Sequence, residues 1–217
     1  MLWLKLLLIL VTLNQSIEAD NFSMQKCQIH NKAYPFEYLF VYRTYDVYYN
    51  RQKRRIFTIP LNLINNFDII QFKFIQISNN TYYIRNERFN EYVCASENQF
   101  FNPSINKINR YGLINDYADS NKRRMIFSVK PSKIDESCEW KLEKIKPFAE
   151  FILFGKKIKQ KESYRLWNVH YKKPLYAIST YVNGPNLKRA VALWYKKPDS
   201  EQFEWYIDCK SGEFLLE

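Results

Sequence analysis

Apolar and polar residues alternate along many short segments of the chain. The alternation is clear at Phe72/Phe74 and at Trp140/Leu142, where an aromatic residue is followed by an apolar one two positions later. A period of two residues predicts strands that bury one face. No long segment shows a helical stripe, and with only four glycines the turns depend on Asn, Asp, Ser and Pro. The pattern predicts an all-β fold.

Three elements recur in the same order and define a repeat. The first is an asparagine followed by an aromatic residue and a short apolar strand, centred on Asn31, Asn86 and Asn168. The second begins with basic residues and ends at a proline, reading KRRIFTIP, KRRMIFSVKP and KRAVALWYKKP at 53–60, 122–131 and 188–198. The third opens with an aromatic residue, reading FKFIQI, WKLEKI and WYIDC at 72–77, 140–145 and 205–209.

Each repeat divides into four strands, and three such repeats predict a β-trefoil with pseudo-threefold symmetry. First and fourth strands would build a six-stranded barrel, and second and third strands would form three capping hairpins, which removes exposed sheet edges. A β-sandwich also contains many short strands, but it does not require three copies. The predicted units cover about 20–78, 79–146 and 163–217, with insertions at 97–121 and 146–162.

The insertions interrupt the threefold pattern. Connections as long as 97–121 are uncommon unless they are functional or disordered. The 146–162 insertion runs apolar and then basic. It is interpreted either as an extra hairpin packed on the barrel, with Lys156–Lys161 as its solvated edge, or as a ligand-binding loop.

The first 19 residues have the pattern of a secretory signal peptide. Lys5 precedes an apolar run from Leu6 to Leu13, and a polar stretch then ends at Ala19. The run is too short for a permanent membrane span, and no later segment approaches that length. Residues 20–217 are therefore expected to be secreted as a single β-trefoil domain.

An oxidising compartment makes the cysteines and sequons interpretable. The mature chain contains Cys27, Cys94, Cys138 and Cys209, which allow two disulfides in three possible pairings. In a trefoil the first and last barrel strands are neighbours, so we expect Cys27–Cys209 and, with it, Cys94–Cys138. Two sequons, at Asn21 and Asn79, are candidate glycosylation sites.

The repeats resemble a group of secreted insect proteins of dipteran type with β-trefoil repeats. More distantly, they are similar to the trefoil domain of the silkworm low-molecular-weight haemolymph lipoproteins. The residues that carry the resemblance read NERFNEYVCAS, RRMIFSV and CEW, then NVHYKKPLYA, KRAVALW and FEW. The silkworm proteins also have a helical N-terminal domain, which this sequence lacks. The Gln-x-Trp motif of ricin-type lectins is missing before Trp140 and Trp205, so lectin sugar-binding residues are not transferred.

The formal net charge is +11, with a pI near 9.4. In a secreted monomer this charge favours acidic polysaccharides, anionic surfaces or acidic protein targets over nucleic acid. The candidate polyanion-binding residues are Lys156, Lys157, Lys159, Lys161, Arg54, Arg55, Arg123, Arg124, Lys188 and Arg189. In the alternative interpretation the repeated arginines cap hairpins or pair with Glu37 and Glu91. The third repeat has Lys173 at the place of those glutamates.

Candidate catalytic chemistry is sparse. The two histidines, His30 and His170, have no metal-ligand spacing, and neither a phosphate loop nor a Gly-x-Ser-x-Gly elbow is present. We therefore expect no enzyme, cofactor or metal site. Three hypotheses remain: a binding protein for anionic glycans or surfaces, a trefoil protease inhibitor using loop 97–121 or 42–52, and a haemolymph or salivary carrier or storage protein.

Overall fold

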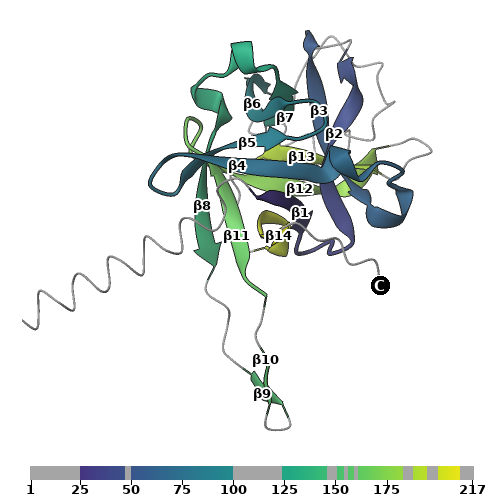
Figure 1. The fold of residues 1–217 in the computed structure, drawn as a ribbon, viewed down its shortest axis with the longest axis vertical. Coiled ribbons are helices and arrows are strands. Elements are labelled where there is room, and N and C mark those ends of the chain that lie inside the picture. The colour runs from purple at the N-terminus through teal and green to yellow at the C-terminus, as the bar shows by residue number, and fades with distance from the viewer. Residues whose placement is uncertain are drawn as a thin grey trace, which may run out of the picture.

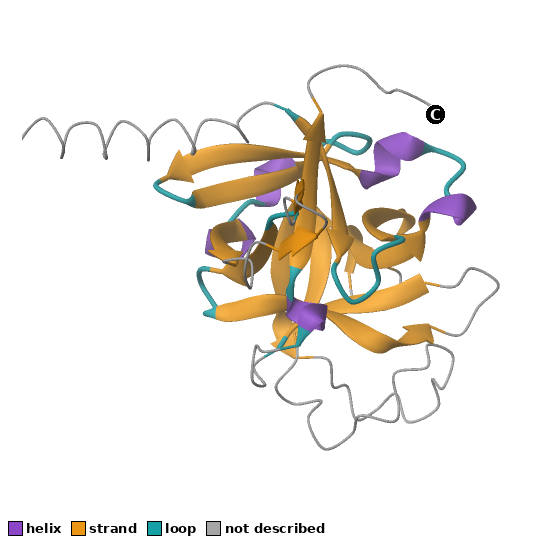
Figure 2. Cartoon of the chain, turned by 90° about the horizontal axis from the view of Figure 1, so that it is seen from below, coloured by secondary structure: helices purple, strands orange, loops and turns teal. Residues whose placement is uncertain are grey.

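The fold was analysed in a computed structural model of the chain. It describes residues 25–46, 50–99, 124–145, 151–153, 156–158, 161–182, 188–194 and 200–210. The predicted signal peptide, the sequon at Asn21 and residues 100–121 of the first insertion lie outside these described residues. The described chain is made of strands and short 3-10 turns, which confirms the all-β class (Figure 2).

Twelve strands belong to one sheet, so the two-sheet sandwich does not apply. The first eight are β1 (Lys26–Asn31), β2 (Glu37–Asp46), β3 (Asn50–Pro60), β4 (Gln71–Ser78), β5 (Thr81–Asn86), β6 (Glu91–Gln99), β7 (Arg124–Val129) and β8 (Glu139–Ile145). The other four are β11 (Ser163–Asn168), β12 (Lys173–Val182), β13 (Lys188–Leu193) and β14 (Trp205–Lys210). The 3-10 turns are η2 (Leu61–Leu63), η3 (Phe67–Ile70), η7 (Pro131–Lys133), η8 (Glu136–Cys138) and η9 (Glu201–Phe203).

Strand pairing forms a closed ring and a cap. The ring runs β1–β4–β5–β8–β11–β14, and β14 pairs back onto β1, every pair being antiparallel. The hairpins β2–β3, β6–β7 and β12–β13 join one another through β3, β7 and β13. Figure 1 shows β8 and β11 side by side at one end of the barrel, away from the β2–β3 and β6–β7 hairpins.

The predicted repeat aromatics lie in the core of the ring. Phe72, Trp140 and Trp205 are fully buried in one cluster. The indole Nε1 of Trp140 donates to the backbone oxygen of Val93 at 2.7 Å, and that of Trp205 donates to Leu175 at 3.1 Å. Burial of such rings contributes about 1.5–3 kcal/mol each, and the indole bonds leave neither nitrogen unsatisfied.

Both disulfides expected from the sequence are present. Cys27 faces Cys209 in the β1–β14 ladder and is bonded to it, joining the two ends of the ring. Cys94 of β6 is bonded to Cys138 of η8. The two bridges fit a protein that folds in an oxidising compartment.

The second insertion contains a hairpin, as expected, but not one packed on the barrel. Strands β9 (Phe151–Leu153) and β10 (Lys156–Ile158) pair only with each other and form a separate two-stranded sheet. In Figure 1 this hairpin lies beyond the β8–β11 end, well apart from the ring. Among the described residues, no helix is both long and apolar enough to cross a bilayer.

Candidate functional site

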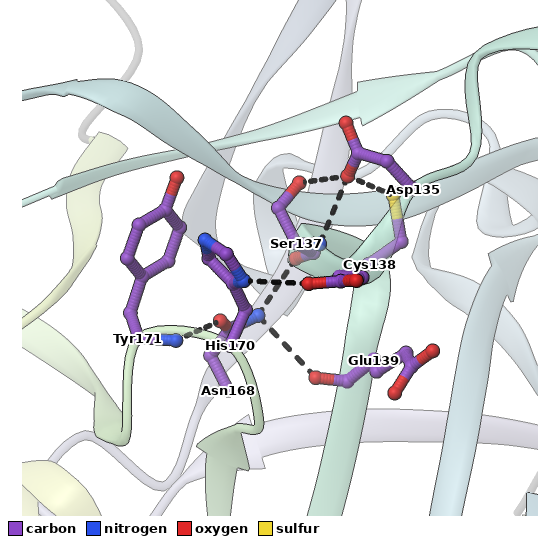
Figure 3. Close-up of polar contacts among 8 residues, drawn as sticks. Asp135, Ser137, Cys138, Glu139, Asn168, His170 and Tyr171 are labelled. Atoms are coloured by element: carbon purple, nitrogen blue, oxygen red, sulfur yellow. Dashed lines mark hydrogen bonds and ion pairs between the residues drawn. The ribbon is translucent and has the colours of Figure 1, made fainter.

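The asparagines at the centres of the repeats are buried structural joints. Figure 3 shows Asn168, whose Nδ2 donates to the backbone oxygens of Ser137 at 2.7 Å and Glu139 at 3.3 Å. Its Oδ1 accepts from the backbone nitrogen of Tyr171 at 3.1 Å. One side chain thus ties the 3-10 turn of the second repeat to the first turn of the third.

Asn31 and Asn86 make the same set of contacts at the other two junctions. Asn31 donates to the oxygens of Gln202 and Glu204 at 2.9 and 3.1 Å. Asn86 donates to those of Ile69 and Gln71 at 3.0 and 3.2 Å. Each amide oxygen also accepts a backbone N–H from the following turn. The repeated asparagine is therefore a folding element, because buried carbonyl groups need partners.

Two of the repeated arginines are held inside the molecule by carboxylates. Arg189 donates to both oxygens of Glu37 at 3.0 and 2.9 Å, and Thr58 Oγ1 donates to the same carboxylate at 2.7 Å. Arg189 is 3% exposed and Glu37 5%. The guanidinium lies over the Tyr34 ring, 3.5 Å from its centroid.

The first repeat places Arg54 in the equivalent position against Glu91. Arg54 Nε donates to Glu91 Oε1 at 3.1 Å, and Ser128 Oγ donates to Oε2 at 2.6 Å. The guanidinium lies over Phe89, 4.2 Å from its centroid, and also donates to the backbone oxygen of Arg43. Each arginine therefore joins its own repeat to the next one around the threefold arrangement.

The third position keeps the arginine and changes its surroundings. Arg124 Nη1 donates to the Ser96 oxygen at 3.2 Å, and its guanidinium lies 4.0 Å from the Tyr171 centroid. Lys173 stands where the other repeats have glutamate, and the buried Leu193 stands where they have a hydroxyl residue.

These contacts agree with the alternative interpretation of Arg54 and Arg189, in which the repeated arginines pair with glutamates, while polyanion binding by the repeated arginines stays a prediction. Both arginines point toward carboxylates of a neighbouring repeat, Arg189 buried and Arg54 partly buried. The structural interpretation of these arginines, pairing with Glu37 and Glu91, is the one that the geometry supports.

The other predicted basic residues occupy several places. Lys188 lies over the Tyr42 ring, 3.9 Å from its centroid, and Arg55 is half-buried in β3. Lys156 and Lys157 belong to β10, in the hairpin that lies apart from the barrel. Arg123 and Lys159 lie outside the described residues.

Lys161 takes part in a cluster at the β1–β14 seam that sequence reasoning missed. The carboxylate oxygen Oδ2 of Asp208 lies 3.0 Å from His30 Nε2 and accepts from Lys161 Nζ at 2.6 Å. The buried His30 ring lies 5.1 Å from each of the Tyr38 and Tyr206 rings. The only sequence signal for this cluster was the expected pairing of the first and last strands. In that ladder Asp208 lies opposite Gln28, two positions from His30.

Burial and charge act in opposite directions on Asp208. Burial by itself raises the pKa of this carboxyl, but the hydrogen bonds and positive charges of His30 and Lys161 outweigh it, so the pKa lies below its ordinary value of 3.8. Burial raises the pKa of the Tyr38 hydroxyl, and the Asp208 carboxylate raises it further. A His–Asp pair can orient a general base, but Lys161 shares this carboxylate, and the arrangement is that of a seam-stabilising ion-pair network.

A cavity opens where the first and second repeats meet. It has a volume of about 280 Å³ and is lined by Arg43, Asn66, Ile69, Arg88 and Phe89. Arg43 comes from β2, Asn66 and Ile69 come from the η3 region, and the other two come from the β5–β6 turn. Both arginines are exposed. Sequence reasoning missed this site because neither arginine belongs to a basic pair.

Two further predictions concern surface chemistry. Asn79 is exposed in the β4–β5 turn, and the Thr81 hydroxyl of its sequon donates to the backbone oxygen of Asn79 at 3.4 Å. Glycosylation there stays a prediction. Among the described residues, no group of three or more His, Cys, Asp or Glu side chains is placed to hold a metal ion.

Comparisons with known proteins identify the fold. No protein-family model matches the chain, and no curated protein matches it in sequence. In structure, it is similar to a salivary protein from Culex quiquefasciatus of the Cysteine and Tryptophan-Rich (CWRC) family. The identity is 15% and the TM-score 0.53, over 86% of this chain and 94% of that one.

Two further solved structures agree. The BEL β-trefoil has 9% identity and a TM-score of 0.52, over 87% of this chain and 94% of that one. The designed threefold-symmetric protein ThreeFoil has 9% identity and a TM-score of 0.54, over 84% and 96%. At such identities the likeness shows the fold alone, which is that of β-trefoil proteins.

Proposed function

We propose that the protein is a secreted, non-enzymatic binding protein for anionic glycans or the cell surfaces that carry them. Its scaffold would be a β-trefoil of three four-stranded repeats with pseudo-threefold symmetry, acting as a monomer. The observation that carries the proposal is the large positive net charge of the mature chain. The net charge of +11 is unchanged by removal of residues 1–19, because Lys5 and Glu18 cancel.

The internal ion pairs do not reduce this excess. Arg54–Glu91 and Arg189–Glu37 are each neutral, so the whole positive excess belongs to residues outside these two pairs. A positive excess of this size raises the local concentration of polyanions around the protein. Two disulfides and the likeness to a salivary protein support secretion.

The test is retention of the mature, oxidised protein on immobilised heparin. We expect binding at about 0.15 M salt and elution as salt rises, because the Debye length falls from about 10 Å at 0.1 M to about 3 Å at 1 M. A sulfonate cation-exchange column is the control, since purely diffuse charge would give the same elution salt on both resins. No retention on heparin at about 0.15 M salt would overturn the proposal.

The lysines of the second insertion are the first candidates for a diffuse contribution. Replacing Lys156, Lys157, Lys159 and Lys161 with Ser should lower the salt needed for elution. Since Lys161 pairs with Asp208, a variant of the first three alone separates charge from stability. Unchanged elution of both variants would exclude this segment from binding.

The alternatives are a trefoil-type protease inhibitor and a haemolymph or salivary carrier or storage protein. The inhibitor loop 97–121 lies mostly outside the described residues. Assays against a panel of serine and cysteine proteases test the first role. Lipid extraction of the native protein followed by mass spectrometry tests the second.

A further inference from the structure

The three repeat junctions are each tied by a buried asparagine, but the further side-chain contacts between the facing turns differ among them. At each one a 3-10 turn faces the turn after a buried asparagine. At the junction of the third and first repeats, Gln202 Nε2 donates to the Tyr34 hydroxyl at 2.8 Å. The oxygen of the same amide accepts from the Tyr176 hydroxyl at 3.0 Å. One side chain thus bridges the two turns.

A different contact ties the turns at the junction of the second and third repeats (Figure 3). His170 Nδ1 lies 3.1 Å from Glu136 Oε2, so a side-chain hydrogen bond spans the two turns. The Tyr171 ring packs edge-on against His170, with the ring centroids 4.5 Å apart.

The junction of the first and second repeats has neither of these contacts. Asn86 donates to the Ile69 oxygen as Asn31 donates to that of Gln202, so Ile69 occupies the place of the bridging amide. Phe89 occupies the place of Tyr34 and has no hydroxyl. Arg88 follows Asn86 by two positions, as His170 follows Asn168. The cavity of about 280 Å³ lies at this junction.

The surface of the cavity wall is mainly apolar, and two exposed arginines are among the residues that line it. Arg43 and Arg88 are exposed cations, and no carboxylate is among the described residues that line the cavity. Asn66 Oδ1 accepts from the Asp68 backbone nitrogen at 2.9 Å, so its Nδ2 is the amide group left to donate. Ile69 and Phe89 supply the apolar part. A guanidinium fork matches the oxygens of a carboxylate or sulfate, and an aromatic ring packs against the apolar face of a ligand.

The surrounding network holds the aromatic wall in place. Arg54 lies over the Phe89 ring, and its guanidinium also donates to the backbone oxygen of Arg43. Glu91, buried at 2% exposure, fixes Arg54 in turn. Two of the five lining residues are thus positioned by a buried ion pair, so part of the wall is preformed.

We propose that this cavity binds a single sugar residue carrying a sulfate or carboxylate group. This inference rests on the proposed function and assigns it a specific site. The volume lies just below the range of about 300–1,000 Å³ typical of drug-sized ligands, which suits one ring. Arg43 and Arg88 would hold the anionic group, and Phe89 would pack against the ring.

The direct test is titration of the mature protein with glucosamine 6-sulfate, glucuronate and glucose, followed by NMR. Saturable binding of either charged sugar is expected, and the one that binds identifies sulfate or carboxylate as the recognised group. Glucose should bind at least about tenfold more weakly, since a charge-assisted hydrogen bond contributes more than one decade in affinity. Equal binding of glucose, or no saturable binding of either charged sugar, would overturn the proposal.

Matched variants separate the cavity from diffuse charge. Arg43→Ser with Arg88→Ser removes two positive charges at the cavity. Lys133→Ser with Lys141→Ser removes two from exposed positions in η7 and β8. The arginine double variant should lose at least about tenfold in affinity for the charged sugar, while the lysine variant keeps the parent affinity. Equal affinities would refute the site.

The outcomes also distinguish the site from the general function. If heparin retains the parent and both double variants elute at the same lowered salt, glycan binding stands and this cavity is not its site. If heparin does not retain the parent but the charged monosaccharide binds through Arg43 and Arg88, the cavity is a monosaccharide site and the proposed binding of anionic polymers is wrong. Filling the cavity with Ile69→Phe, at an unchanged net charge, should abolish monosaccharide binding. The Tm of each variant verifies its folding.

Discussion

Arg189 and Glu37 lie 152 residues apart in the chain, yet Arg189 donates two hydrogen bonds to the Glu37 carboxylate inside the protein. The pair joins β13 of the third repeat to the start of β2 in the first. Arg54 and Glu91 join the first repeat to the second in the same way. This arginine–glutamate pair is not repeated at the equivalent position of the third repeat, where Lys173 replaces the glutamate.

Removing one partner of the buried pair should be strongly destabilising. Glu37→Gln leaves the Arg189 charge buried without its counter-ion, which costs about 3–5 kcal/mol. For a domain of this size, Tm should fall by roughly 6–20 °C. The matched control is Glu136→Gln, whose parent carboxylate is 81% exposed beside His170 and should change stability by less than about 1 kcal/mol. Thermal unfolding followed by circular dichroism compares the two variants. Equal losses of Tm would contradict a stabilising role of the buried Arg189–Glu37 pair.

The repeated asparagine should not tolerate its isosteric acid. Asn168→Asp puts an oxygen opposite the Ser137 and Glu139 carbonyls, which now receive the amide protons at 2.7 and 3.3 Å. Loss of two buried bonds and burial of a charge should cost roughly 3 kcal/mol or more. Asn79→Asp, at an exposed turn, should stay within about 0.5 kcal/mol of the parent. Urea unfolding measures both variants, and a stable Asn168→Asp protein would show that the joint is dispensable.

The two disulfides should differ in their effect on stability. Cys27–Cys209 closes a separation of 182 residues and Cys94–Cys138 one of 44. Chain entropy gives stabilisations of about 5 and about 4 kcal/mol. Double Cys→Ser variants of each pair, compared by urea unfolding, should show the larger loss for the first pair. The reverse order would indicate that native packing around Cys94 outweighs loop entropy.

Stability at acid pH should depend on Asp208. Its pKa is lower in the folded protein than its ordinary value of 3.8. The unfolded state therefore binds the proton more readily, and the contribution of Asp208 to stability is present above about pH 4 and is lost as the pH falls through the folded pKa. Asp208→Asn should lower Tm at pH 6, and its difference from the parent should shrink below pH 4. A difference that stays constant down to pH 2 would exclude this linkage.

Sequence patterns alone predicted most of the framework. The period of two residues predicted strands, because a half-buried strand leaves its alternation in the local sequence. Repetition of the third element gave Phe72, Trp140 and Trp205 equivalent positions, and the structure buries all three in one core. Cys27 and Cys209 could be paired because the first and last strands of a closed ring must be neighbours.

The candidate site depended on tertiary structure. The local sequence around a repeated arginine such as Arg189 does not show whether its side chain faces solvent or a buried glutamate, because the partner lies in another repeat. Arg43, Asn66 and Arg88 come from separate segments and share no motif, so their position around one cavity follows only from the way the first repeat docks on the second. The sequence by itself determined which segments become strands and core, because those are local or repeated properties. Which charges are neutralised inside and which surround a cavity was decided by the tertiary structure, because it depends on distances between segments far apart in the chain.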